Sequence, residues 1–263
     1  VMRVTPQPPS PAPSGTPEQS QARVVRYEHG TAQHTVDDAV AVEEPLEIRL
    51  GRYDEGRLQH RPVSITMRTP GDDFELAAGF LYTEGILQCR AQVQEIHHCG
   101  KGKGLTNTLR VDLSPGVTVD VQRLERNFYT TSSCGVCGKT SIEALATGAV
   151  PVAPPPGFAV DARLIGELPA RLQAQQHTFR STGGLHASAL FSRAGELLTL
   201  REDVGRHNAL DKVVGARFLA DALPASDTIL FLSGRASFEL LQKAVMAGIP
   251  VVCAVGAPSS LAI

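Results

Sequence analysis

The spacing of apolar and polar residues divides the chain into two regions of different character. In the first, residues 23–28, 39–50 and 61–68 alternate Val, Ile, Leu or Met with polar residues, as half-buried strands do. Residues 105–113 and 116–121 are expected to add two more strands. We interpret residues 22–130 as a small N-terminal α+β domain.

One helix is predicted within this first region. Pro70-Gly71-Asp72-Asp73 ends a strand and supplies capping residues, and Gly85 follows the last apolar position. The residues expected on the buried face of the helix are Phe74, Ala77, Ala78 and Leu81.

The second region, residues 131–263, has the pattern of an α/β fold. Residues 228–232 and 249–255 are short apolar runs separated by a helical pattern at 238–247. This order predicts a strand–helix–strand unit with parallel strands. A hairpin over 187–201, a helix over 161–173 and a helix with Leu210, Val213, Val214 and Phe218 on one face complete the expectation of a three-layer domain around a mixed sheet.

Composition and charge limit the partners and the cellular location that we expect. Residues 1–21 are rich in Pro, Ser and Gln, which predicts a disordered tail. The formal net charge of -2 gives no reason to expect nucleic acid binding. The chain shows neither a long apolar run nor a secretory signal, and its five cysteines do not form a disulfide framework, so we expect a cytoplasmic protein with reduced thiols and no membrane contact.

Cys134 and Cys137 are the most informative pair in the sequence. They form a Cys-x-x-Cys segment flanked by glycines, with Lys139 close by and a short helix predicted after Ser141. A helix N-terminus and a nearby cation both lower the pKa of a thiol, which raises the thiolate fraction at neutral pH. The segment is typical of sulfur chemistry.

The other cysteines and neighbouring histidines are less specific. Cys89, His97, His98 and Cys99 offer zinc-ligating atoms, but their spacing matches no common zinc pattern. We expect a surface loop there and no metal. Cys253 stands within an apolar strand and is expected to be a buried structural residue.

Three polar clusters follow the cysteine pair. Each combines glycine or a turn with cationic or hydroxyl donors, which suits phosphate or another anion. His186 and His207 can equally be buried, hydrogen-bonded side chains. The candidate ligand-binding residues are Thr182, Gly183, Gly184 and His186; Arg206, His207 and Asn208, after Asp203; and Ser233, Gly234, Arg235 and Ser237.

Taken together, these motifs resemble the FdhD family, the formate dehydrogenase accessory sulfurtransferases. The segments that carry the resemblance are residues 43–48, 67–81, 133–139, 182–186, 201–212 and 233–239.

The resemblance implies a role in maturation of the molybdenum cofactor. Such proteins take sulfur from a cysteine desulfurase as a persulfide and pass it to the bis(molybdopterin guanine dinucleotide) cofactor of formate dehydrogenase. Cys134 would carry the sulfur with Cys137 as its helper, and the three clusters would hold the guanine-nucleotide phosphates. The resemblance also implies a cytidine-deaminase-like second domain, a homodimer, and a further strand and cofactor-binding segment beyond Ile263.

Three other functions compete with this one. A zinc-dependent nucleobase deaminase needs His-x-Glu followed by Pro-Cys-x-x-Cys, whereas Ser133 precedes Cys134 and Ser188 stands two positions after His186. A thioredoxin-like oxidoreductase carries its Cys-x-x-Cys after an early strand. A non-catalytic chaperone of the molybdenum cofactor remains an open alternative.

Overall fold

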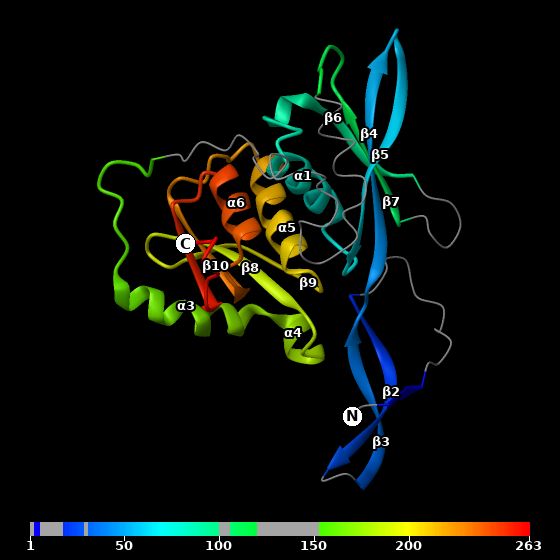
Figure 1. Ribbon diagram of the computed structural model, residues 1–263, viewed down its shortest axis with the longest axis vertical. Helices are drawn as coiled ribbons and strands as arrows, with labels where there is room; N and C mark the ends of the chain where they lie inside the picture. Colours follow the sequence, from blue (N-terminus) through cyan, green and yellow to red (C-terminus); the bar gives the residue numbers. More distant parts are fainter. Residues whose placement is uncertain (1–2, 6–17, 29–30, 100–105, 120–152) are drawn as a thin grey trace.

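The computed structural model describes residues 3–5, 18–28, 31–99, 106–119 and 153–263. Their strands form three sheets, and helices α1, α5 and α6 lie between two of these sheets (Figure 1). No helix in these ranges combines the length and the apolar character needed to cross a bilayer.

The first sheet is an antiparallel arm that extends away from the helices (Figure 1, blue). Its strands are β1 (Arg3–Thr5), β2 (Gln19–Glu28) and β3 (Thr31–Ala41). The predicted disordered tail, residues 1–21, is therefore wrong at Arg3–Thr5 and Gln19–Gln21, which pair as strands. The strand predicted over 39–50 is two strands, because the chain leaves β3 after Ala41 and begins β4 at Glu44.

The second sheet has the order β5-β4-β7-β6 and is covered on one face by α1. Leu46, Ile48 and Leu50 alternate into its core, as the period of a half-buried strand requires. The elements are β4 (Glu44–Asp54), β5 (Arg57–Arg68), α1 (Asp73–Thr83), a 3-10 turn (Arg90–Gln92), β6 (Val93–His98) and β7 (Thr108–Leu113).

Two local predictions fail in this sheet. Phe74 is 40% exposed, because it lies in the first turn of α1 and packs on the ring of His98 rather than on the core. Residues 116–119 form no strand; Val117 and Val119 pack against the core from an irregular segment. The predicted buried positions Ala77, Ala78 and Leu81 are confirmed.

The third sheet has the order β11-β10-β8-β9 and is mixed, as predicted. β10 and β11, which precede and follow α6 in the sequence, pair with each other in parallel. β8 is antiparallel to both of its neighbours, β10 and β9. The elements are α3 (Ala162–Gln175), α4 (His177–Thr182), β8 (His186–Ser192), β9 (Leu197–Asp203), α5 (Arg206–Leu219), β10 (Thr228–Arg235), α6 (Phe238–Met246) and β11 (Val251–Gly256).

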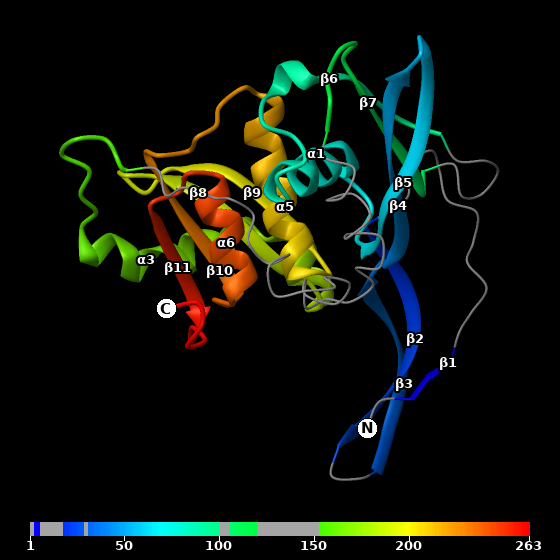
Figure 2. The ribbon, with the colours of Figure 1, turned by 45° about the horizontal axis from the view of Figure 1, so that its top comes forward.

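Helices cover both faces of this sheet, which gives the expected three layers (Figure 2). Leu190 and Leu230 face α5 and α6, and the alternate residues Phe191 and Phe231 face α3. Ser233-Gly234-Arg235 lie beyond the strand predicted over 228–232 but continue β10, because Arg235 pairs with Gly256 after an irregularity in the strand.

The two predicted domains share a helical layer. α1 of the first region packs directly on α5 of the second, and the side chain of Lys243 in α6 reaches Thr83 in α1 and Asp211 in α5 at 2.9 Å each. The domain boundary predicted at residue 130 lies outside the described residues.

Candidate functional site

The candidate site lies at the edge of the third sheet where β9, β10 and β11 end and β8 begins. β8 starts at His186 and β9 ends at Asp203, and these two residues are paired across the strands. α5 begins at Arg206 immediately beyond this edge. The carboxyl ends of strands beside helix N-termini are where α/β folds bind ligands.

A cavity of about 530 Å³ opens at this edge. Four of the predicted ligand-binding residues line it: Gly183, Gly184, His186 and Ser233. Its remaining lining residues are Pro169, Leu172, Gln173, Gln176, Phe179, Leu185, Phe231 and Val255. An apolar wall with a few polar groups is the usual composition of a small-molecule pocket.

His186 presents a neutral imidazole to the cavity. Burial lowers its pKa, the positive charge of Arg206 lowers it further, and the carboxylate of Asp203 acts in the opposite direction. Gly234 lies beside the ring, since a Cβ atom at this position would be in ordinary van der Waals contact with His186 Nδ1 at 3.4 Å. At neutral pH the imidazole can therefore donate one hydrogen bond and accept another.

Asp203 anchors the turn that precedes α5. Its side chain is fully buried, and its oxygens accept hydrogen bonds from Gly205 N at 2.8 Å and from Thr69 N at 3.2 Å. Lys212 Nζ lies 2.9 Å from Oδ2. Burial raises the pKa of Asp203, and the Lys212 ammonium opposes that rise. The network fixes the start of α5, and with it Arg206, relative to β5 and α1.

Two predicted ligand-binding side chains are occupied by structural hydrogen bonds. Asn208 donates to Met67 O at 2.7 Å and to Asp203 Oδ1 at 3.1 Å, and accepts from Thr66 Oγ1. Thr182 donates to Thr178 O at 2.8 Å within α4. Neither residue lines the cavity.

The other predicted residues lie around the same edge but outside the cavity. Unlike them, Gly183 lines the cavity; it is in the left-handed conformation, with φ of 66°, and caps α4, a helix that the sequence pattern does not predict. Arg235 is exposed at the end of β10, and His207 is buried at the start of α5. Ser237 Oγ, at the cap of α6, is buried and has no hydrogen-bond partner in the described part of the chain.

Cys134 and Cys137, and the short helix predicted after Ser141, lie outside the described residues. Among the described cysteines, Cys89 is exposed, while Cys99 and Cys253 are partly buried; all three are free. The prediction that Cys253 is buried is confirmed only in part, because the residue is partly buried; this burial raises the pKa of its thiol.

The zinc-ligating residues Cys89, His97, His98 and Cys99 do not assemble into one site. His97 and His98 are neighbours in β6 rather than in a loop, so their side chains leave opposite faces of the strand. Within residues 3–5, 18–28, 31–99, 106–119 and 153–263, the one group of three metal-ligating side chains close together is Glu95, His97 and Asp112.

The apolar wall of the cavity is not predicted from the sequence. Leu172 falls within the helix predicted over 161–173, with no role in binding, and no role is predicted for Phe179 or Leu185. The signal was present: α3 carries Leu168 and Leu172 one turn apart, and both are buried against the sheet. The turn that closes the cavity is not predicted, because Pro169 interrupts the helical pattern of α3 and because the short helix α4 has no clear signal of its own.

Comparison with known proteins identifies the family. Residues 41–263 match a model of the FdhD/NarQ family. The chain is 52% identical over 246 residues to the sulfur carrier protein FdhD of Streptomyces coelicolor, covering 92% of this chain and 84% of that protein. It is 47% identical over 250 residues to the sulfur carrier protein FdhD of Mycobacterium tuberculosis, covering 92% of this chain and 87% of that protein.

A solved structure is also similar. The crystal structure of a putative formate dehydrogenase accessory protein from Desulfotalea psychrophila superposes with a TM-score of 0.68 at 25% identity, covering 94% of this chain and 87% of that one. Because the family model spans most of the chain and the relatives are close to half identical, the chain belongs to the FdhD/NarQ family of sulfur carrier proteins.

Proposed function

We propose that this protein is a sulfurtransferase that carries persulfide sulfur from a cysteine desulfurase to the bis(molybdopterin guanine dinucleotide) cofactor used by formate dehydrogenase. The observation that carries the proposal is the cavity lined by Gly183, Gly184, His186 and Ser233 at the strand ends, in a chain with a Cys-x-x-Cys segment and sulfur carrier relatives. The finer assignments below rest on this proposal.

The first step is a thiol exchange that is balanced without an outside oxidant. The thiolate of Cys134 attacks the terminal sulfur of the desulfurase persulfide, the S–S bond of the donor breaks, and the donor cysteine leaves as a thiolate. The sulfur is then held on Cys134 as a new persulfide. Lys139, five positions on, would favour the thiolate that this attack requires.

Cys137 is assigned as the helper in delivery. Its thiolate attacks Cys134 Sγ, the terminal sulfur leaves as sulfide toward the acceptor, and a disulfide remains between the two residues. A cellular dithiol then reduces that disulfide and restores both thiols. Two serines precede Cys134, and glycines stand at positions 135 and 138. With so few side-chain atoms around the pair, both the donor and the acceptor would have access to the sulfur atoms.

The cavity is assigned to one nucleotide end of the cofactor. A dinucleotide of this kind is larger than about 530 Å³ allows, so the cavity would take the guanine nucleotide and leave the metal-bearing end outside. The N–H groups of Gly183 and Gly184 already donate within the chain, to Phe179 O at 2.7 Å and to Thr182 Oγ1 at 3.3 Å. The groups left to bind phosphate or base oxygens are the neutral imidazole of His186 and the hydroxyl of Ser233, which lines the cavity and still has its own proton to donate. Arg206 supplies the nearby positive charge.

The same proposal includes a homodimer, a cytidine-deaminase-like second domain and a cytoplasmic setting, with a desulfurase and formate dehydrogenase as partners. No nucleic acid or membrane partner is included.

A non-catalytic cofactor chaperone is the second candidate, because the cavity on its own would explain binding without sulfur transfer. Formate dehydrogenase activation in cells carrying the Cys134→Ala variant discriminates the two. A sulfurtransferase loses activation while guanine-nucleotide binding by the purified variant is retained. A chaperone retains both, and that result would reject the proposal.

A further inference from the structure

On the outer face of the second sheet, two carboxylates and a histidine lie in a row that crosses its four strands. Glu95 of β6 is paired with Asp112 of β7, Asp112 with Gly51 of β4, and Gly51 with His60 of β5. Directly paired residues share a face of a sheet. Leu50 and Val111, which flank the row in sequence, are buried on the opposite face against α1.

Gly51 allows the side chains of His60 and Asp112 to meet. A Cβ atom at this position would overlap Asp112 Oδ1 and would lie 2.9 Å from His60 Cδ2. Without a side chain on β4, His60 Nε2 reaches across the strand to within 3.2 Å of Asp112 Oδ1. The sheet therefore brings an imidazole and a carboxylate together over a strand that separates their backbones.

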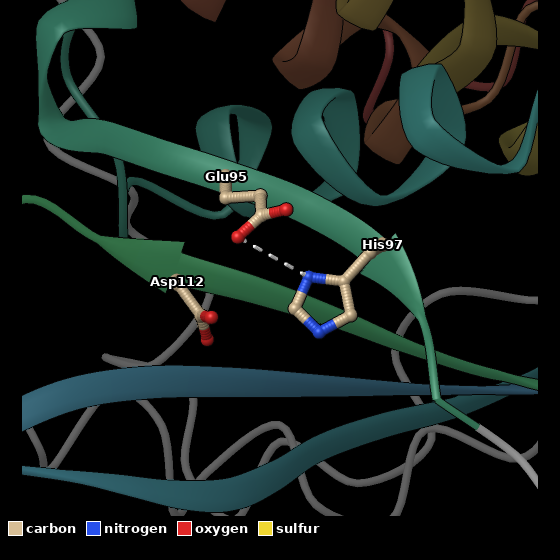
Figure 3. A group of neighbouring side chains, drawn as sticks. All are labelled: Glu95, His97 and Asp112. Carbon is tan, nitrogen blue, oxygen red and sulfur yellow. Dashed lines mark ion pairs between the residues drawn. The ribbon is translucent and has the colours of Figure 1, made fainter.

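His97 joins the same face from β6, two residues beyond Glu95 (Figure 3). The candidate ligand atoms of Glu95, His97 and Asp112 all lie within 4.8 Å of one another. His97 Nδ1 is buried and makes no hydrogen bond in the described part of the chain; its nearest anionic atom is Glu95 Oε2 at 3.9 Å. His97 Nδ1 therefore has a lone pair or a proton that no hydrogen bond in the described part of the chain uses, beside the Glu95 carboxylate.

We propose that Glu95, His97 and Asp112 form a binding site for a divalent transition metal ion, with Zn²⁺ as the best match. One imidazole and two carboxylates are ligands that Zn²⁺ accepts, and they leave a coordination position open to water or to a further ligand. Ligand atoms around tetrahedral Zn²⁺ are about 3.4 Å apart, given bonds of about 2.1 Å. The Glu95 side chain is 67% exposed and can make the remaining inward movement.

The surroundings of the site are those of an outer coordination sphere. Arg110 Nη2 donates to Asp112 Oδ2 at 3.0 Å, and His60 contacts the other oxygen. Such partners orient a ligating carboxylate, which has lone pairs beyond those they use. Two carboxylates and one guanidinium leave the cluster one negative charge, so a cation is attracted. The neighbouring Arg49 is paired with Glu47 at 2.9 Å.

Titration of the metal-free full chain with Zn²⁺ and with Co²⁺, followed by calorimetry and by absorption, tests this site. The variants are His97→Gln and Glu95→Gln, whose side chains are partly or largely exposed. The matched controls are His34→Gln on the arm and Glu167→Gln, an exposed carboxylate on α3 that is paired with Arg171. The native protein and the four variants all keep every cysteine. A difference in ion affinity between them therefore comes from the proposed site and not from binding to thiolates.

The expected result is one saturable ion per chain at this site, bound at least tenfold more weakly by both His97→Gln and Glu95→Gln and unchanged in both controls. The Co²⁺ spectrum should lose only its nitrogen- and oxygen-ligand bands in the two variants. Equal affinity in native protein and His97→Gln, or loss of binding only when thiols are blocked, would overturn the proposal. Because catalysis is not measured, failure here leaves the sulfur-transfer proposal untouched.

Discussion

Gly79 in α1 and Gly215 in α5 lie at the point where these two helices cross. A Cβ atom on Gly79 would lie 2.7 Å from Gly215 N and would overlap the carbonyl of Asp211, and a Cβ on Gly215 would overlap the carbonyl of Glu75. The two backbones therefore touch without side chains between them. This contact joins the second sheet to the third and sets where the start of α5 lies.

Gly79→Ala and Gly215→Ala should each destabilise the protein, by about 1–3 kcal/mol or more, because the added methyl group overlaps backbone that cannot move independently. Denaturant unfolding of each variant gives the difference directly. Gly166→Ala in α3 is the matched control, since its Cβ would meet nothing within 4 Å. That variant should gain about 0.5–1 kcal/mol from helix propensity. Equal stability of all three would show that the crossing is looser than described.

Lys243 should be required for stability, because it is buried and bonded to both oxygens of Asp211 at 2.9 Å. Lys243→Met leaves that carboxylate buried without its cation and should cost about 3–5 kcal/mol. Arg193→Met, which removes an ion pair to Asp227 whose partners are 45% and 54% exposed, should cost less than about 1 kcal/mol. Thermal unfolding of both variants provides the comparison.

The same pair predicts a loss of stability in alkali. Burial alone lowers the pKa of Lys243, but the carboxylates of Asp211 and Glu84 outweigh it, and the net direction is upward. The folded protein therefore retains this proton at pH values where the unfolded chain loses it. The contribution is complete below the unfolded pKa and disappears as pH rises through the folded value. Stability measured against pH in Lys243→Met should lack this alkaline component; an unchanged profile would contradict the assignment.

His186 should titrate below its ordinary range. Because its folded pKa is lowered by burial and by Arg206, the folded state holds fewer protons than the unfolded state in that window, and stability should fall as pH drops through it. The imidazole Cε1–H resonance reports the midpoint. Arg206→Gln should raise it, whereas Arg193→Gln at the far end of β8 should not. An identical shift in both variants would mean that Arg206 does not act on this ring.

Guanine-nucleotide binding should be sensitive to the mouth of the cavity. Val255 lines the cavity and is 66% exposed, so Val255→Trp should fold normally and weaken binding of a guanosine diphosphate probe by roughly tenfold through occlusion. Leu198→Trp, at a site 43% exposed on β9 and outside the cavity lining, is the control. Equilibrium dialysis measures both. Undiminished binding by Val255→Trp would move the nucleotide to another surface.

Local periodicity was sufficient for much of the third sheet. The apolar runs that became β10 and β11 and the stripe of Leu210, Val213, Val214 and Phe218 on α5 are strongly periodic, and all four stripe residues are buried. Such patterns determine burial because one face must leave water. The strand–helix–strand order then fixes parallel pairing of β10 with β11.

The remainder depends on contacts between residues that are far apart in the sequence. β6 was missed because Gln94, Glu95, His97 and His98 are polar, and the strand exists through pairing with β7. Asn208 and Thr182 carry donor groups typical of ligand binding, yet Met67, Asp203 and Thr178 use them. Gly51 and Gly79 read as ordinary glycines until the backbone or side chain beside them is known.

Mass spectrometry of the native protein after incubation with a cysteine desulfurase and cysteine tests the central claim most directly. An adduct of about 32 Da, one sulfur atom, should appear on the peptide containing Cys134 and should be removed by a thiol reductant. It should be absent in Cys134→Ala and should accumulate in Cys137→Ala, which lacks the helper thiol. A native protein that never gains this mass, while still activating formate dehydrogenase, would contradict persulfide transfer.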